Sequence, residues 1–314
     1  MSEHSSARQP PTELETVADF VRWGASEFNR AGLHYGHGTD NACDEASWLV
    51  LHALSLEPPI PEALYGARLS VDEKGIVAEW IARRIETRQP AAYLIGEARF
   101  AGLRFHVNEH VLVPRSPIGE LIESGFSDWL VESPDHIADL CTGSGCIAVA
   151  TAMVFPGARV WATEIDEPAV AVAHRNVERY RLQERVQLCQ GDLYADLPRD
   201  GRFDLIIANP PYVDDAAMAA LPGEYRQEPA LALAGGRTGL DFAARIVEQA
   251  ADYLAPEGVL IMEVGHNGPA LEKRFPQLPM EWPAFERGGF GVCVIHAADL
   301  GVLATPDEGD PHAG

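Results

Sequence analysis

A chain of 314 residues that is 46% hydrophobic can bury one large apolar core and a smaller second one, so we expect two domains. Its 47 acidic residues outnumber 24 basic ones and give a formal net charge of -23, which disfavours sequence-specific binding to nucleic acid and favours a basic protein as partner. No apolar run reaches the roughly 20 residues of a membrane span or resembles a secretory signal, so a cytoplasmic protein is expected. The five cysteines lack the paired spacing of a zinc site, and no metal is expected.

The first part of the chain carries a helical pattern. Apolar side chains recur at three- and four-residue intervals between about residues 12 and 95. Thr12 with Glu15 and Ser70 with Glu73 have capping-box spacing ahead of the first and last helical segments. The pattern predicts an N-terminal helical domain over residues 1–98 and a second domain over residues 99–314.

Extended runs replace the helical pattern after residue 98. Residues 99–113 are typical of a β-hairpin with its turn at Asn108-Glu109, which would link the two domains. Beyond it, apolar runs alternate with helical patterns, as in an α/β fold with a parallel, doubly wound sheet. We expect strands at His136–Leu140, Arg159–Ile165, Val186–Cys189, Phe203–Ala208, Gly258–Val264 and Gly291–His296.

A glycine-containing turn, Asp139-Leu-Cys-Thr-Gly-Ser-Gly-Cys146, follows the first of these strands and precedes an apolar helix. Gly143 and Gly145 let the backbone turn sharply and approach a ligand at the helix N-terminus. The third glycine of a dinucleotide fingerprint is missing, and the Asp139 carboxylate would oppose a pyrophosphate but suit the ammonium group of a methionine moiety. The turn therefore favours S-adenosylmethionine (AdoMet) over NAD, with Thr142 a further candidate contact, although such a turn alone is also typical of a structural loop.

Acidic residues end the next two strands. Glu164 lies about 20 residues beyond the turn, where a carboxylate can accept hydrogen bonds from both ribose hydroxyls. Asp166 would face differently if the strand continues, so Glu164 is the candidate. Asp192, after the third strand, could meet the adenine edge or could simply cap a turn.

The motif Asn209-Pro210-Pro211-Tyr212 follows a buried strand, at the edge where open parallel sheets bind ligands. Its prolines make a stiff turn without N–H donors. The Asn209 side-chain oxygen and the Pro210 carbonyl can accept both hydrogens of a planar NH₂ group, and Tyr212 can cover its face. An ordinary rigid loop is the alternative. We predict Asn209, Pro210 and Tyr212 as catalytic residues, with Asn209 also contacting the cofactor and Pro211 the substrate.

Residues 30–298 resemble the bacterial protein-glutamine methyltransferases of the HemK/Prm family. The resemblance implies a seven-stranded, Rossmann-like class I AdoMet methyltransferase domain, joined by a hairpin to an N-terminal helical domain that recognises the substrate. The Asn-Pro-Pro-Tyr motif alone also resembles that of DNA adenine methyltransferases. Those enzymes must flip a base and hold a polyanion, for which this charge balance is poor.

Two branches of this family compete, one acting on peptide chain release factors and one on large-subunit ribosomal protein L-three. The segments Tyr35–Ala46 and Val113–Ile122 resemble the second branch, because Ser116-Pro117-Ile118-Gly119 replaces the release-factor pattern Pro-Arg-Pro-x-Thr-Glu. The resemblance implies methyl transfer to the side-chain amide nitrogen of a glutamine in that basic ribosomal protein. A release-factor enzyme and a catalytically idle ribosome-assembly factor are the alternatives.

The resemblance also implies roles for three charged residues. Arg115 and Glu120 would lie near the cofactor and substrate pocket, although a surface ion pair at a helix start would have the same pattern. Glu228, in the stretch 227–236, would contact the incoming glutamine segment, unless it only caps a helix.

Overall fold

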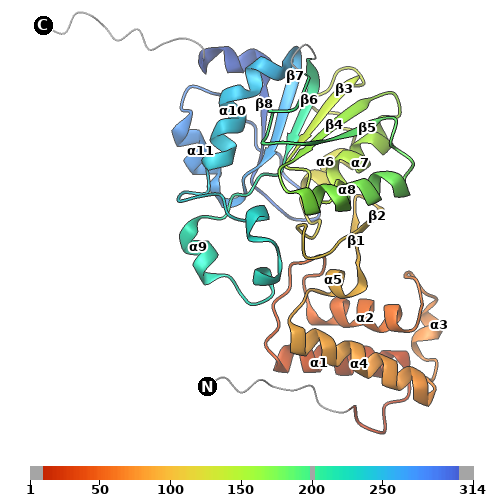
Figure 1. The fold of residues 1–314 in the computed structure, drawn as a ribbon. Helices are drawn as coiled ribbons and strands as arrows, with labels where there is room; N and C mark the ends of the chain where they lie inside the picture. The colour runs from red at the N-terminus through yellow and green to blue at the C-terminus, as the bar shows by residue number, and fades with distance from the viewer. Residues whose placement is uncertain (1–9, 199–201, 304–314) are drawn as a thin grey trace, which may run out of the picture. The chain divides into compact units, whose positions relative to one another are not determined.

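The computed structural model describes residues 10–198 and 202–303, and the chain forms two compact units (Figure 1). Unit 1 holds the chain up to Ala98 and also two short later segments, so a single boundary after residue 98 does not describe it. Its later segments are Val107–Glu109 and Leu221–Glu228, and unit 2 comprises Arg99–His106, His110–Ala220 and the chain from Pro229 onward.

Unit 1 is built from five helices: α1 (Val17–Arg30), α2 (Ala42–Ala53), α3 (Glu62–Tyr65), α4 (Val71–Thr87) and α5 (Ala91–Ile95). Their apolar faces form one core, in which Phe28, Leu49 and Ile81 are fully buried. Among the residues that the structure describes, no helix combines the length and apolarity needed to cross a membrane.

The helix starts agree only in part with the sequence. Ser70 and Glu73 form the predicted capping box ahead of α4. The expected box of Thr12 and Glu15 is wrong. Thr16 caps α1 instead, because its hydroxyl accepts the Asp19 N–H while the Asp19 carboxylate accepts the Thr16 N–H.

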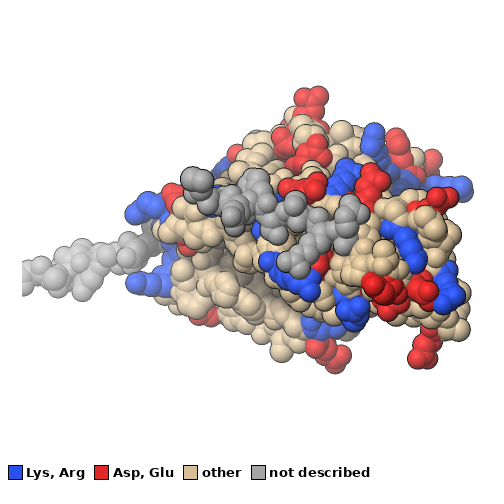
Figure 2. All heavy atoms as spheres, turned by 90° about the horizontal axis from the view of Figure 1, so that it is seen from below, with Lys and Arg blue, Asp and Glu red and all other residues tan. Residues whose placement is uncertain are grey.

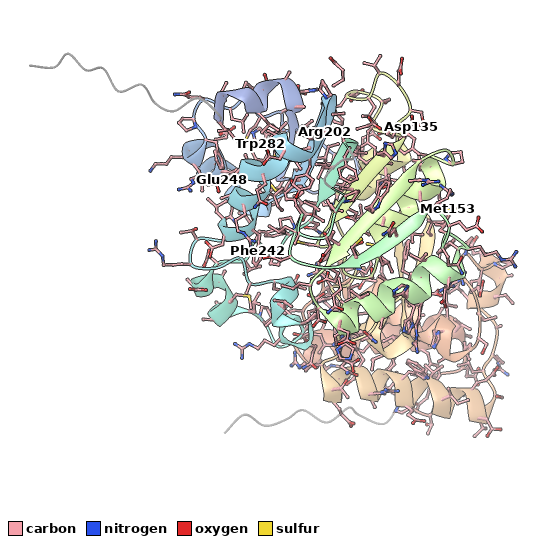
Figure 3. The ribbon with its side chains drawn as sticks, turned by 45° about the horizontal axis from the view of Figure 1, so that its top comes forward. Asp135, Met153, Arg202, Phe242, Glu248 and Trp282 are labelled. Atoms are coloured by element: carbon pink, nitrogen blue, oxygen red, sulfur yellow. The ribbon has the colours of Figure 1, made fainter. Side chains whose placement is uncertain are left out.

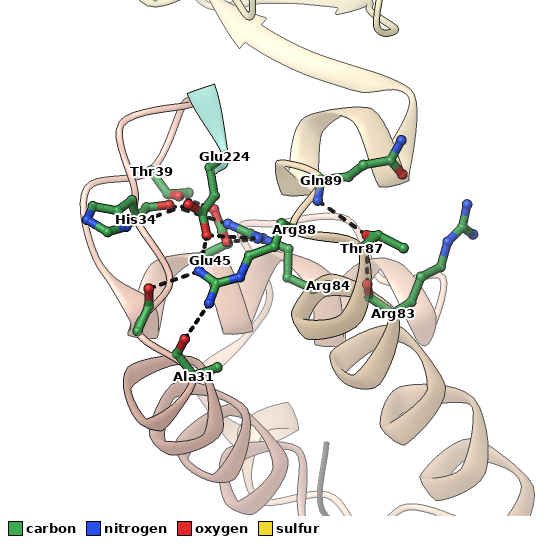
Figure 4. A network of polar contacts seen from close by, with 11 residues as sticks. Ala31, His34, Thr39, Glu45, Arg83, Arg84, Thr87, Arg88, Gln89 and Glu224 are labelled. Atoms are coloured by element: carbon green, nitrogen blue, oxygen red, sulfur yellow. Dashed lines mark hydrogen bonds and ion pairs between the residues drawn. The ribbon is translucent and has the colours of Figure 1, made fainter. Parts of the chain in front are cut away.

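Buried charges join the later segment of unit 1 to its helices (Figure 4). Arg84 of α4 is fully buried and donates from Nε to Glu45 Oε1 of α2 at 2.6 Å. Arg88, at the left-handed C-cap of α4, donates to Glu224 Oε1 at 2.8 Å and to the Ala31 carbonyl at 2.7 Å. Residues 221–228 are therefore held in the helical unit by ion pairs as well as by packing.

A two-stranded hairpin of β1 (Glu97–Phe100) and β2 (Leu103–His106) follows α5. The predicted turn at Asn108-Glu109 is wrong, because the chain reverses at Ala101-Gly102. Both of these residues have positive φ, 45° and 72°, as a tight two-residue hairpin turn requires.

The sheet of unit 2 has six strands in the order β5-β4-β3-β6-β7-β8 (Figure 1). β3 to β7 are parallel and β8 runs antiparallel to β7, so the expected fully parallel sheet is wrong for the last strand alone. The strands are β3 (His136–Leu140), β4 (Arg159–Glu164), β5 (Val186–Gln190), β6 (Phe203–Ala208), β7 (Leu254–Glu263) and β8 (Val292–His296).

Helices cover both faces of this sheet because alternate strand residues point to opposite sides. Ile137 packs on one face with α6, α7 and α8, and Ala138 packs on the other with α10 and α11. The helices of unit 2 are α6 (Ile118–Glu123), α7 (Cys146–Val154), α8 (Glu167–Arg179), α9 (Asp215–Ala220), α10 (Asp241–Tyr253) and α11 (Gly268–Arg274).

A seventh strand does not form within the described residues, in contrast to the expectation. At its place, Glu281 makes a single bridge to Val294 of β8, with N–H to carbonyl distances of 3.0 and 2.9 Å. Pro279 and Pro283 stand two residues to either side, where the next bonds to β8 would be donated. Because proline has no N–H, the ladder ends after one residue.

Candidate active site

A cavity of about 300 Å³ opens in unit 2 beyond the carboxyl ends of β3, β4, β5 and β6. The labelled Phe242 of its wall lies at this edge, away from Asp135 and Arg202 at the amino ends of the strands (Figure 3). Of the predicted residues, the cavity is lined by Arg115, Thr142, Gly143, Glu164, Asp192, Asn209 and Pro211. The fold therefore brings together predicted site residues that lie up to about a hundred positions apart in the sequence.

The two glycines of the first turn do different things. Gly143 has φ +55°, lines the cavity and has open space where a Cβ would stand, and its N–H donates to Glu164 Oε2 at 2.9 Å. Gly145, with φ +77°, is the N-cap of α7 and does not line the cavity. A Cβ there would stand 3.2 Å from the Ala173 Cβ, so Gly145 permits the close approach of α7 and α8.

Asp139 lies beneath the turn rather than on the cavity wall. Its carboxylate is fully buried, accepts the Thr142 hydroxyl and accepts the Ala148 N–H at 3.0 Å. Burial raises the pKa of Asp139 to about 7. In this position the side chain holds the turn against the start of α7, and a direct contact with a cofactor ammonium stays a prediction.

Glu164 is in the position expected for a ribose-binding carboxylate. Its Oε1 accepts the N–H groups of Ile165 and Asp166 at 2.9 and 3.1 Å, and burial raises its pKa. Asp166 instead caps α8 through Ala169 N–H. Both acids line the cavity, but the Asp166 carboxylate is also engaged as the cap of the following helix.

Asp192 lines the cavity, but its carboxylate is already paired. Arg245 of α10 donates from Nη2 to Asp192 Oδ2 at 2.6 Å. No local pattern marked this arginine as part of the site, because it lies 53 residues from its partner in the chain. Any contact of Asp192 with an adenine would be made beside this ion pair.

The Asn-Pro-Pro-Tyr motif presents only part of itself to the cavity. Asn209 and Pro211 line it, whereas Pro210 is buried and Tyr212 is not in the lining. The Tyr212 ring lies against Gly265, where a Cβ would come within 2.8 Å of its Cε2. The expected cover of an amide by this ring stays a prediction, while Asn209 is placed where a substrate group could meet it.

The three charged residues implied by the family resemblance lie in three settings. Arg115 lines the cavity and donates from Nη1 to the Val113 carbonyl at 3.2 Å. Glu120 lies outside the lining and accepts the backbone N–H groups of Glu286 and Arg287, which lower its pKa.

Glu228 belongs to unit 1 and is absent from the cavity lining. Its carboxylate is buried, and Oε2 lies 3.5 Å from Nε2 of the fully buried His37. A contact of Glu228 with the incoming glutamine segment stays a prediction.

One functional candidate was missed. Glu263 ends β7, and its carboxylate accepts the Ser116 hydroxyl at 2.5 Å and the Tyr212 hydroxyl at 2.7 Å. Burial raises its pKa. The available signal was an acidic residue that directly follows the apolar run Val259–Met262, at the same sheet edge as the motif.

The sheet with its cavity at the carboxyl edge defines a Rossmann-like α/β enzyme. The family model "Methyltransferase small domain" matches residues 127–222, and the protein is a methyltransferase. A relative from Bordetella pertussis, named ribosomal protein uL3 glutamine methyltransferase, is 48% identical over 273 residues, covering 86% of this chain and 91% of its own. A relative of the same name from Burkholderia pseudomallei is 46% identical over 303 residues, covering 94% of this chain and 98% of its own. The chain belongs to the ribosomal protein uL3 glutamine methyltransferase family.

Solved structures also match. A methyltransferase from Pyrococcus furiosus is 23% identical, with a TM-score of 0.47, and the match covers 62% of this chain and 89% of that one.

Proposed function

We propose that this enzyme transfers the methyl group of AdoMet to the side-chain amide nitrogen of a glutamine in ribosomal protein uL3. The observation that carries the proposal is the position of Asn209 in the cavity wall, facing the space that Gly143 and Glu164 also line. The two relatives that cover most of the chain carry the name of this activity.

The cavity fits AdoMet as the methyl donor. Its volume of about 300 Å³ lies at the lower end of small-molecule sites. Glu164 Oε1 already accepts two backbone N–H groups, whereas Oε2 accepts one and keeps a lone pair that can accept a ribose hydroxyl. Leu231 and Phe242 supply apolar wall for an adenine ring.

The amide needs activation because its nitrogen lone pair is delocalised into the carbonyl. Asn209 Oδ1 on the cavity wall can accept one amide hydrogen, and the carbonyl of the adjoining Pro210, whose side chain is buried outside the lining, is the proposed acceptor of the second; together they would localise the lone pair on nitrogen. When bound, AdoMet would supply the methyl group: the N–C bond would form as the sulfonium C–S bond breaks, the neutral thioether would leave, and the surplus N–H proton would pass to solvent water. Positioning and preorganised dipoles supply the rate enhancement.

The charge of the chain supports a basic protein as substrate. The net charge of -23 attracts a cationic partner at long range. On the face shown in Figure 2, acidic and basic side chains are interspersed, so the attraction arises from the whole chain rather than from one patch of that face.

The test is an incubation of the purified enzyme with recombinant uL3 and isotope-labelled AdoMet, followed by peptide mass spectrometry. We expect one labelled methyl group on a glutamine side chain of uL3. Release factors serve as the parallel substrates. Labelling confined to a release factor would assign the enzyme to the other branch, and absence of label from both would contradict amide methylation.

A further inference from the structure

We propose that Glu263 is a positioning residue for methyl transfer, fixing Tyr212 of the Asn-Pro-Pro-Tyr motif and the Ser116 turn to one buried carboxylate. The proposal rests on the function proposed above, because it takes the Asn209 side of the cavity as the place of reaction. It assigns to Glu263 no contact with substrate or cofactor.

The sheet places Glu263 beside the motif. Met262 pairs with Ala208, so the next residues of the two strands, Glu263 and Asn209, leave the carboxyl edge together. On its other side Glu263 pairs with Val292 of the antiparallel strand β8. A side chain supported by strands on both sides is held more firmly than one on a loop.

The hydrogen bonds of Glu263 connect two segments that lie far apart in the chain. Oε2 accepts the Ser116 hydroxyl at 2.5 Å and Oε1 accepts the Tyr212 hydroxyl at 2.7 Å. Ser116 Oγ in turn accepts the Ile118 N–H at 3.2 Å, which directs its own hydrogen toward Glu263. Ser116 lines the cavity, and Tyr212 ends the motif whose first residue, Asn209, also lines it.

The carboxylate that accepts both bonds is the ionised form. Burial raises the pKa of Glu263, while the two hydroxyl donors and the nearby Arg115 charge lower it in part. An ionised Glu263 accepts from both hydroxyls at once, whereas a protonated carboxyl offers a competing donor. The connection of Ser116 and Tyr212 through Glu263 is therefore strongest when the Glu263 side chain is charged.

Tyr212 is held at its backbone as well as at its hydroxyl. Because the backbone is fixed by other groups, the orientation of the ring depends on the bond to Glu263. Asn267 Nδ2 donates to the Tyr212 carbonyl at 2.7 Å, and the ring rests on Gly265. With the backbone fixed by Asn267 and by two prolines, the hydroxyl bond to Glu263 sets the remaining freedom of the ring. Loss of that bond should disturb the geometry of Asn209 rather than the cofactor site.

The first experiment compares Glu263→Gln, Tyr212→Phe and the double variant in uL3 methylation. We expect kcat to fall about 10- to 100-fold in Glu263→Gln, because small displacements of positioned groups cost this much. The Kd for AdoMet, measured by calorimetry, should stay within about twofold. Glutamine keeps one acceptor oxygen for the two hydroxyls and phenylalanine removes the Tyr212 donor, so both changes weaken the same Tyr212–Glu263 bond, and the double variant should be little worse than the more impaired single one.

Glu281→Gln is the matched control. Glu281 also bridges to the sheet, and its carboxylate accepts a hydrogen bond from an aromatic partner, Trp129 Nε1, at 2.9 Å, but away from the cavity. This variant should keep kcat. Wild-type kcat in Glu263→Gln, or additive losses in the double variant, would overturn the proposal.

A second readout does not depend on activity. With 3-fluorotyrosine placed at residue 212, the ¹⁹F resonance should shift and broaden in Glu263→Gln and stay unchanged in Glu281→Gln. If Glu263→Gln does not fold, Ser116→Ala removes the other bond and should give a smaller shift of the same resonance. An unchanged resonance in both would refute the role of Glu263, whereas inactivity of the wild-type enzyme on uL3 would refute only the proposed function.

Discussion

Arg84 Nε lies 2.6 Å from Glu45 Oε1, and neither side chain is exposed to solvent. A buried ion pair of this kind links α4 to α2 in the centre of unit 1. Removal of one partner leaves the other charge buried without its counterion.

We therefore expect Arg84→Met to destabilise unit 1 by about 3 to 5 kcal/mol. The measurement is urea denaturation followed by circular dichroism. Arg68→Met is the control, because the Arg68–Glu15 pair is largely exposed and exposed pairs contribute little. Equal losses in the two variants would contradict a special contribution from the buried pair.

The strand positions could be predicted because each strand is an apolar run bounded by polar residues, and runs of this kind must be buried in a sheet with both faces covered. The observed β3 and β6 have the predicted bounds, and β4 ends one residue earlier, at Glu164. The same reasoning placed Asn209 at the ligand-binding edge. Periodicity and the bounds of apolar runs are local properties that a sequence displays directly.

The remaining features depend on partners far along the chain. Glu263 meets Ser116 147 residues away and Tyr212 51 residues away, and no local pattern reports such a meeting. The hairpin turn was misplaced because Ala101-Gly102 has a non-glycine residue with positive φ, which sequence rules disfavour. The seventh strand was expected from family resemblance, whereas Pro279 and Pro283 prevent it.

Gly145→Ala tests the packing of α7 on α8. The added Cβ would stand 3.2 Å from Ala173 Cβ at a φ of +77°, so both strain and crowding oppose it. We expect a loss of about 1 to 3 kcal/mol in unfolding free energy. Gly157→Ala, where nothing lies within 4 Å and φ is ordinary, should leave the unfolding midpoint nearly unchanged.

Glu164→Gln tests the assigned ribose contact. Glutamine keeps one acceptor oxygen but replaces the other with an NH₂ donor, which would face Gly143 N–H or a ribose hydroxyl unfavourably. We expect the affinity for AdoMet to fall about tenfold or more, by calorimetry, since one lost charge-assisted hydrogen bond is worth roughly 1.5 to 3 kcal/mol. Glu167→Gln, at an exposed position near Glu164 that is outside the cavity lining, should change the affinity much less.

Asp139 makes stability depend on pH. Its pKa is about 7 in the folded chain against an ordinary value of 3.8, so between these values the folded state holds a proton that the unfolded state has released. Stability therefore falls as pH rises from about 4 to about 7, and it is flat beyond both limits for this group. In thermal melts, the Tm of Asp139→Asn should rise relative to the Tm of the wild type as pH increases from about 4 to about 7. A constant gap would contradict the raised pKa.

Asn209 is the residue on which the proposed chemistry depends most directly. Asn209→Ala removes a side-chain acceptor from the cavity wall, and Asn209→Asp keeps an oxygen at the same place but adds a negative charge. If the side chain holds an amide hydrogen in the transition state, kcat for uL3 methylation should fall about 100-fold or more in the alanine variant. The loss in Kd for AdoMet should be several-fold smaller, because Glu164 and the Gly143 turn remain. Near-normal turnover by Asn209→Ala with AdoMet bound would show that the amide is held elsewhere. Partial retention in Asn209→Asp alone would show that the acceptor oxygen, rather than the intact carboxamide, is what methyl transfer requires.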